Sequence, residues 1–161
     1  LHVLDLSEPE DPEELGQLKL PGFSRYLHPL SGDRLLGIGE EDGHVKTVIF
    51  DVSDPTDPAV EHSRILGAHF SAAAHNHHAF LQDTRHEAFF LPTENGGQVL
   101  STNDLDVHHT LTVRDPQRAI YVGDYLYVFG REDVSVIDER NWTRTTTYDL
   151  PVPQDYAASG D

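Results

Sequence analysis

Short apolar runs alternate with polar turns along the whole chain. The runs are rich in β-branched and aromatic residues, and Gly, Pro, Asp and Asn separate them. No segment keeps the i, i+3, i+4, i+7 spacing of an amphipathic helix over three turns. Short strands with turn residues about every ten positions predict an all-β fold.

The predicted strands fall into groups of four after an initial pair. Residues 1–20 contain two strands, 1–6 and 14–20, joined by a turn between prolines. Three longer segments, 22–67, 70–114 and 115–150, contain four strands each, and we expect residues 151–161 to form a flexible tail. The strands are 24–28, 34–39, 45–52 and 60–66, then 77–81, 86–92, 98–102 and 107–113, then 118–122, 125–129, 134–138 and 143–150.

One segment occurs twice. Leu4–Pro12, LDLSEPEDP, matches Phe50–Pro58, FDVSDPTDP, position by position. Repeated four-stranded units with a period of about 35–50 residues are typical of β-propeller blades, and each blade buries its faces against its neighbours. The sequence therefore predicts about three and a half blades of four antiparallel strands, an incomplete ring beside the usual four to eight. A β-sandwich is the alternative fold, although it does not require the matched segments.

The chain is strongly acidic. It has 28 Asp and Glu against 11 Lys and Arg, a formal net charge of −17, with only two lysines, Lys19 and Lys46. Such a surface repels nucleic acid and anionic lipid, so we expect no nucleic-acid partner. Dispersed acids with so little Lys predict a halophilic source. No apolar run approaches the roughly 18 residues of a membrane span, so we expect no membrane insertion.

Five segments carry a family resemblance. They are Gly22–Leu30, Asp33–Gly39, Phe50–Pro58, Asn76–Leu81 and Arg118–Tyr127. Their order and spacing resemble the secreted β-propeller domain proteins of archaea and bacilli, distant relatives of WD40 repeats. The resemblance covers nearly the whole chain and implies an extracellular or cell-envelope protein. It also implies that this chain, which starts inside a strand-like run, is the C-terminal half of a larger propeller.

Histidine is the one unusual residue count, at eleven. If residues 77–81 continue as a strand from residue 75, His75 and His77 share one face and His78 lies on the other. His28 and His77 fall on the first strands of successive blades, which we expect to lie innermost, near a central channel. His28, His75, His77 and His78 are therefore candidate ligands for a divalent metal ion such as Zn²⁺, Ni²⁺ or Cu²⁺. The alternative is that these side chains bond to turn carbonyls and pack in loops.

The resemblance weakens this cation site at one position. Where the family tends to have Asp, this chain has Asn76. The family also has no established reaction to extend to this chain.

The Asp-rich turns offer several oxygens to Ca²⁺. However, Asp and Ser near Pro form turns through bonds to their own backbone, and the EF-hand pattern is missing. We interpret Asp51, Ser53, Asp54 and Asp57 as turn formers, and Asp5 and Asp51 as equivalent turn caps.

Aromatic residues alternate at Tyr121, Tyr125, Tyr127 and Phe129, a pattern that favours packing between blades over a binding platform. No nucleophile elbow, H-E-x-x-H motif or P-loop is present.

Two functions remain open. The first is a non-catalytic binding or scaffold propeller whose ligand is a protein, a peptide or a saccharide. The second is a hydrolase or metalloenzyme with a site at the channel that includes His28 and His77. An incomplete ring exposes two blade faces, so the sequence also predicts self-association through them.

Overall fold

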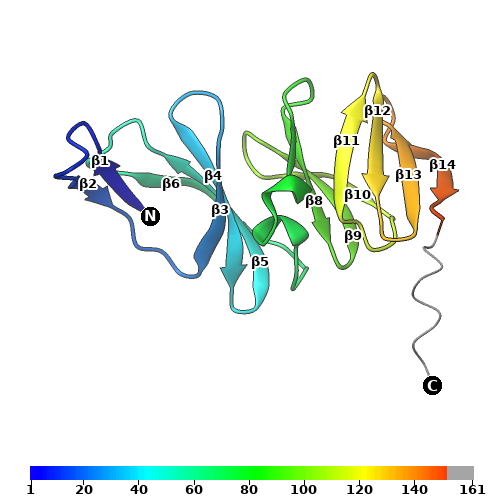
Figure 1. The fold of residues 1–161 in the computed structure, drawn as a ribbon, viewed down its shortest axis with the longest axis horizontal. Helices are drawn as coiled ribbons and strands as arrows, with labels where there is room; N and C mark the ends of the chain where they lie inside the picture. The colour runs from blue at the N-terminus through cyan, green and yellow to red at the C-terminus, as the bar shows by residue number, and fades with distance from the viewer. Residues whose placement is uncertain (152–161) are drawn as a thin grey trace.

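The computed structural model describes residues 1–151, which form four antiparallel sheets in a row (Figure 1). The first sheet is a pair and the other three have four strands each. The strands are β1 His2–Asp5 and β2 Glu13–Gln17, then β3 Phe23–Pro29, β4 Arg34–Glu41, β5 His44–Asp51 and β6 Ala59–Ile65, then β7 Leu81–Asp83, β8 Ala88–Thr93, β9 Gly96–Ser101 and β10 Val107–Leu111, then β11 Arg118–Val122, β12 Tyr125–Phe129, β13 Asp133–Asp138 and β14 Thr143–Asp149.

Each four-stranded sheet is a meander in which consecutive strands pair, as in a propeller blade. The predicted fold class, an incomplete ring of four-stranded blades, is confirmed, and the sandwich alternative is wrong. The tail expected over residues 151–161 falls, after Pro151, outside the described residues. Between residues 1 and 151 no helix has the length and apolar character needed to cross a membrane.

The repeated turn recurs at the end of one strand in every sheet. A side-chain oxygen at the strand end accepts a hydrogen bond from the backbone N–H two residues later. The pairs are Asp5 with Ser7 (2.8 Å), Asp51 with Ser53 (2.9 Å), Ser101 with Asn103 (3.0 Å) and Asp138 with Arg140 (3.0 Å). These bonds lower the pKa of Asp5 and of Asp51. The interpretation of both residues as turn caps is confirmed.

The apolar core lies between the sheets. Phe89 and Leu91 of β8 pack toward the β3–β6 sheet, against Leu36 and its neighbours. Phe90, one residue along, points the other way and packs against residues of the β11–β14 sheet, among them Leu126. Because β8 alternates between two buried faces, the β7–β10 sheet is covered on both sides.

One predicted strand is wrong. Residues 77–81 begin with the 3₁₀ turn η2 (His77–Ala79), which follows a similar turn η1 (Ala72–Ala74), and strand β7 begins only at Leu81. The Asn76 side chain accepts a hydrogen bond from the His78 N–H at 3.1 Å and so caps the turn. His75 and His77 therefore do not share the face of a strand.

Gly39 gives a test of the β3–β4 pairing. A Cβ at this position would overlap the Phe23 carbonyl and lie 2.7 Å from Ser24 Cα, both backbone atoms of the partner strand. We expect Gly39→Ala to lower the free energy of unfolding by about 3 kcal/mol, measured by urea denaturation, because overpacked backbone cannot relax as a side chain can.

Gly67→Ala is the matched control. A Cβ at Gly67 meets no atom within 4 Å, so its free energy of unfolding should change by less than about 1 kcal/mol. Equal losses in the two variants would contradict this explanation.

Candidate functional site

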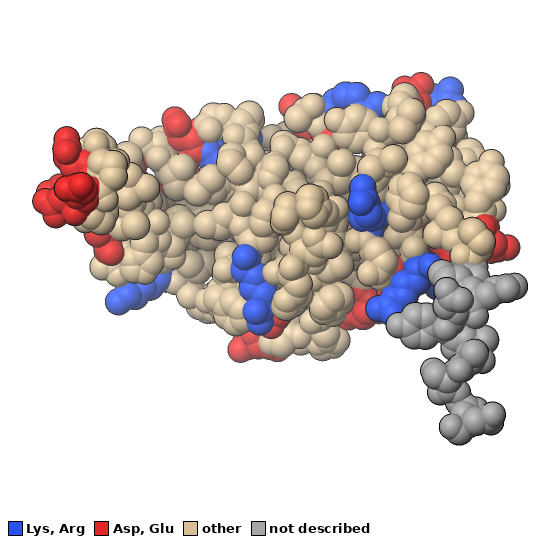
Figure 2. Space-filling view, viewed as in Figure 1, with Lys and Arg blue, Asp and Glu red and all other residues tan. Residues whose placement is uncertain are grey.

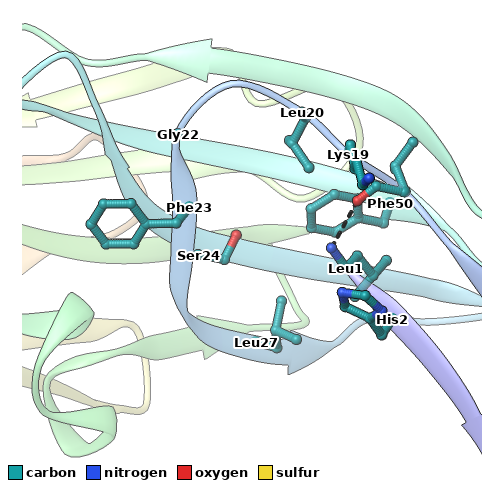
Figure 3. Close-up of a pocket in the computed structure, with 10 residues that line it drawn as sticks. Leu1, His2, Lys19, Leu20, Gly22, Phe23, Ser24, Leu27 and Phe50 are labelled. Carbon is teal, nitrogen blue, oxygen red and sulfur yellow. Dashed lines mark hydrogen bonds between the residues drawn. The ribbon is translucent and has the colours of Figure 1, made fainter.

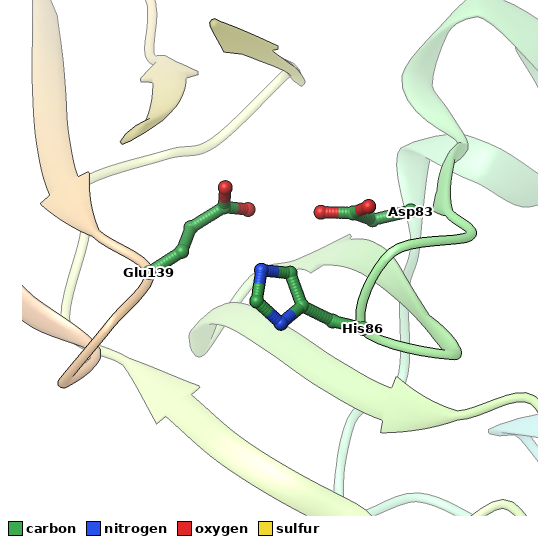
Figure 4. A group of neighbouring side chains, drawn as sticks. All are labelled: Asp83, His86 and Glu139. Carbon is green, nitrogen blue, oxygen red and sulfur yellow. The ribbon is translucent and has the colours of Figure 1, made fainter. Parts of the chain in front are cut away.

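A cluster of charged side chains lies at the junction of the last two sheets. Asp83 ends β7, and Arg85 and His86 follow it in the turn before β8. Glu139 comes from the turn between β13 and β14. Figure 4 shows the carboxylates of Asp83 and Glu139 facing each other, with the His86 ring beside them. We call Asp83, Arg85, His86 and Glu139 the Arg85 junction.

Arg85 joins the two sheets. Its guanidinium donates to Asp83 through Nε to Oδ1 (2.9 Å) and Nη2 to Oδ2 (2.6 Å). The same Nη2 donates to Glu139 Oε2 at 2.7 Å, and Nη1 donates to the Gly123 carbonyl. The guanidinium carbon lies 4.3 Å from the centre of the Tyr121 ring, a cation–π contact. Arg85 thus contacts three separate parts of the last sheet.

The two carboxylates of the junction are buried, with residue exposures of 6% for Asp83 and 3% for Glu139. Burial raises the pKa of Asp83, but the hydrogen bonds and charge of Arg85 outweigh it, so the net shift is downward. Burial also raises the pKa of Glu139. The single hydrogen bond from Arg85 does not offset this increase, so the net shift is upward. One guanidinium therefore neutralises Asp83 more fully than Glu139.

In principle these groups can hold a metal ion. Among residues 1–151, Asp83, His86 and Glu139 are the one group of three or more that offers ligand atoms within 4.8 Å of one another. Yet the Arg85 guanidinium already binds both carboxylates, and a divalent cation has to displace it. The donor set fits a buried ion-pair network better than a metal centre.

His28 lies where β3 meets the next sheet. Its Nδ1 accepts from the Tyr26 hydroxyl at 3.0 Å, and its Nε2 donates to Gln82 Oε1 at 2.9 Å. Its ring also packs against Phe80, with 4.5 Å between ring centroids. Both ring nitrogens are engaged, so in this arrangement neither is free to bind a metal ion.

The other three candidate metal ligands lie in the loop before β7. His75 stacks on Phe70 with 5.6 Å between ring centroids, and its Nε2 lies 3.9 Å from Glu40 Oε1. His77 and His78 are neighbours in η2, with ring centroids 3.9 Å apart. None of the four predicted histidines belongs to the group of close ligand atoms found within the described residues.

A cavity of about 500 Å³ lies between the β1–β2 pair and the β3–β6 sheet. Figure 3 shows the side chains around it. Its apolar wall consists of Leu1, Leu18, Leu20, Phe23, Leu27 and Phe50. The pair of strands therefore covers only part of the β3–β6 face that it packs against.

Within residues 1–151, the last sheet has one face without a neighbouring sheet. Its inner face, which includes Leu126 and Ile137, packs on the β7–β10 sheet. Residues directly opposite in antiparallel strands share a face, so the cross-strand pairs define the second face. The apolar residues of that face are Ile120, Val122, Tyr125, Tyr127, Phe129, Val134, Val136 and Tyr148, and Arg118, Asp138 and Thr146 share it. We call it the open face, and Val122 and Tyr148 are 58% and 61% exposed on it.

The alternating aromatic residues thus divide between the two faces. Tyr121 contacts Arg85 at the junction, as expected for packing between blades. Tyr125, Tyr127 and Phe129 lie on the open face instead.

Acidic side chains are most concentrated at the opposite end of the molecule. Figure 2 shows Asp and Glu gathered over the end that carries β1 and β2. The segment from Glu8 to Glu14 contains five acids, Glu8, Glu10, Asp11, Glu13 and Glu14, all exposed. The open face and this acidic end lie at opposite ends of the row of sheets (Figure 1).

Comparison with solved structures agrees with a propeller. The chain is similar to apo AztD from Citrobacter koseri, with a TM-score of 0.60 and 16% identity over 87% of this chain and 39% of that one. It is also similar to a europium-containing methanol dehydrogenase, with a TM-score of 0.54 and 13% identity over 83% of this chain and 27% of that one. At these identities the likeness shows the fold alone. The molecule is therefore an arc of β-propeller blades.

The family follows from the sequence match. The model of the beta propeller domain family matches residues 1–142, and the chain belongs to this family. An uncharacterized protein of Archaeoglobus fulgidus is 45% identical over 142 residues, which is 88% of this chain and 23% of the relative. The uncharacterized protein MJ1554 of Methanocaldococcus jannaschii is 36% identical over 149 residues, 88% of this chain and 24% of that protein. The chain spans about a quarter of the length of these relatives.

Sequence reasoning missed the Arg85 junction. Asp83 and Arg85 lie between the predicted strands 77–81 and 86–92 and were given no role, and neither was Glu139. One signal was present: Asp-x-Arg occurs at residues 83–85 and again at 138–140. In both copies the Arg guanidinium returns to the Asp carboxylate.

Arg85→Met tests the junction. Removing the guanidinium leaves two buried carboxylates facing each other, so we expect the free energy of unfolding to fall by about 2–4 kcal/mol. The range extends down to about 2 kcal/mol because 38% of the Arg85 side chain is exposed, and solvent weakens the ion pairs that it makes. Because the pKa of Asp83 is lowered in the folded state, its contribution is present above the ordinary Asp pKa of about 3.9. The loss should therefore shrink as the pH falls below about 4, in urea unfolding measured at several pH values.

Arg140→Met is the matched control. Arg140 makes the same pair with Asp138 but is 61% exposed and has no second carboxylate from another sheet. We expect a loss of less than about 1 kcal/mol. A loss as large as that of Arg85→Met would contradict the role of the Arg85 junction, because bonding to a second sheet would then add nothing to the stability.

Proposed function

We propose that this chain is a non-catalytic binding or scaffold segment of a larger β-propeller. The observation that supports this most directly is the position of Arg85. The one close cluster of acid and imidazole groups within residues 1–151 is bound by its own guanidinium, which joins two sheets. Such a group of carboxylates holds the scaffold together and is not available to a substrate.

His28, the candidate for a channel site, supports the same proposal. Its two nitrogens are bonded to Tyr26 and Gln82, so it offers no free base to a substrate. The hydroxyl and amide partners fix its ring between two sheets. This arrangement favours a structural role for His28 over a catalytic one.

The two ends of the arc are the surfaces through which this segment would pack against neighbouring blades. The open face of the last sheet has the composition of the faces that are buried between sheets, with aromatic and β-branched residues at alternate positions. The partly covered wall of the N-terminal cavity is its counterpart at the other end. In a longer propeller, as in relatives about four times the length, further blades would cover both ends. A protein or saccharide ligand would then bind to the completed ring.

The acidic surface supports a further part of the proposal, that the protein works in high salt outside the cell or at its envelope. A net charge of −17 on 161 residues repels itself, and counter-ions reduce that repulsion. The gathering of acids over the β1–β2 end increases this effect locally (Figure 2).

Self-association tests the role of the open face. We expect the isolated chain to pair with a second copy through this face in 2 M KCl, where charges are screened over less than about 3 Å. Light scattering should then give about twice the chain mass of 18.0 kDa. The Val122→Asp/Tyr148→Asp double variant should give the monomer mass, because two charges cannot be buried unpaired in an apolar contact.

The control replaces a partly exposed apolar residue on another sheet. Val107 of β10 is 38% exposed and lies on another sheet, so Val107→Asp should still dimerise. A wild-type chain that remains monomeric at every salt concentration would contradict the proposal. So would dimerisation of the double variant.

Salt should also stabilise the fold itself. We expect the melting temperature to rise by several degrees between 0.05 M and 2 M KCl, since screening removes repulsion among the acidic residues. Circular dichroism melts measure this directly. A melting temperature that stays constant or falls would contradict adaptation to salt.

A further inference from the structure

Two histidines outside the predicted set of metal ligands lie side by side at the tip of a hairpin. His44 begins β5, directly after the β4–β5 turn, and His69 lies in the segment that follows β6. Their ring centroids are 4.4 Å apart, with 38° between the ring planes. His69 is exposed and His44 is half-buried, so an ion in solvent can reach the pair.

The hydrogen bonds of the two rings define which nitrogen carries the proton. His44 Nδ1 lies 3.1 Å from the Asp42 carbonyl oxygen, and His69 Nδ1 lies 2.9 Å from the Gly43 carbonyl oxygen. A carbonyl oxygen can only accept, so Nδ1–H is the donor in both rings. In the neutral form, each Nε2 then has a free lone pair. This is the arrangement that orients a histidine in a metal site, where a carbonyl holds the nitrogen that does not bind the metal.

The backbone around the pair is well supported. The turn residues Asp42 and Gly43 have φ of 50° and 76°, as in a two-residue hairpin loop. The Val45 N–H donates to the Ala68 carbonyl at 2.8 Å, which joins the hairpin to the segment that contains His69. The Glu94 carboxylate accepts the N–H groups of His69 and Phe70, at 2.5 and 2.9 Å. Both imidazoles are therefore positioned before any ion binds.

We propose that His44 and His69 form a binding site for a transition-metal ion such as Ni²⁺, Cu²⁺ or Zn²⁺, which imidazole nitrogens favour. With metal–nitrogen bonds of about 2.0–2.1 Å, two imidazoles on one ion have ring centroids roughly 4.5–5.5 Å apart. The observed 4.4 Å separation of the ring centroids is close to the lower end of this range. Water completes the coordination, and the negative net charge raises the local concentration of cations. This site does not depend on the proposed scaffold function.

The neighbouring His77 and His78 lack this arrangement. Their rings are also close, at 3.9 Å between centroids, but they are consecutive residues of a short 3₁₀ turn. Within residues 1–151 neither Nδ1 is bonded to a backbone carbonyl, so nothing fixes their tautomer or orientation. They serve as the matched control pair.

Calorimetric titration with Ni²⁺ alone tests the site. The wild-type chain should bind one Ni²⁺ with an affinity at least about tenfold higher than that of His44→Asn or His69→Asn, a loss on the scale of disturbed metal sites. Asn is the informative replacement because its amide N–H can still donate to the turn carbonyl while the Nε2 ligand is gone. Equal melting temperatures of the metal-free proteins will show that these variants keep the fold.

The His77→Asn/His78→Asn double variant should bind Ni²⁺ as the wild type does. A second readout is the ¹⁵N chemical shift of the imidazoles, in which Zn²⁺ should move the Nε2 signals of His44 and His69 alone. Unchanged Ni²⁺ affinity in the His44→Asn/His69→Asn double variant would overturn the proposal. Loss of binding in the His77/His78 variant would also overturn it.

Discussion

The structure depends on the burial of apolar side chains between neighbouring sheets. Phe89 and Phe90 are adjacent in β8, almost fully buried, and packed against different sheets. Each large apolar side chain removed from water contributes about 1.5–3 kcal/mol, and a sheet with two apolar faces gains this only with a neighbour on both sides. The same requirement explains the open face of the last sheet and the partly covered cavity at the first.

Polar groups complete the contact between sheets where apolar ones end. Arg85 bonds to Asp83 in its own sheet and to Glu139 in the next, so two buried carboxylates share one guanidinium. His28 makes a similar contact between the two preceding sheets, through its hydrogen bond to Gln82. Because buried polar groups are costly without partners, these contacts restrict how two blades can be placed relative to each other. Of the histidines that the sequence offered as candidate ligands, His28 is thus one that joins two sheets.

Local sequence was enough to predict most strands. The β11–β12 hairpin follows the predicted boundaries residue by residue, because apolar alternation and the Gly123-Asp124 turn are both short-range signals. The same reasoning failed at residues 77–81. There the Asn76 side chain bonds to the His78 backbone and closes a 3₁₀ turn, an alternative that side-chain to backbone bonds offer to any strand.

The sequence by itself determined the blade repeat, the Asx turns and the acidic net charge, since each depends on residues within one turn or on composition. Only the tertiary structure decided which distant side chains meet. Asp83 and Glu139 come together because two sheets stack, and His44 and His69 because a hairpin tip is hydrogen-bonded to a later segment. The pattern of apolar and polar residues along the sequence gives the alternation within each strand. It does not give how one sheet is shifted relative to the next, and this shift decides which side chains meet.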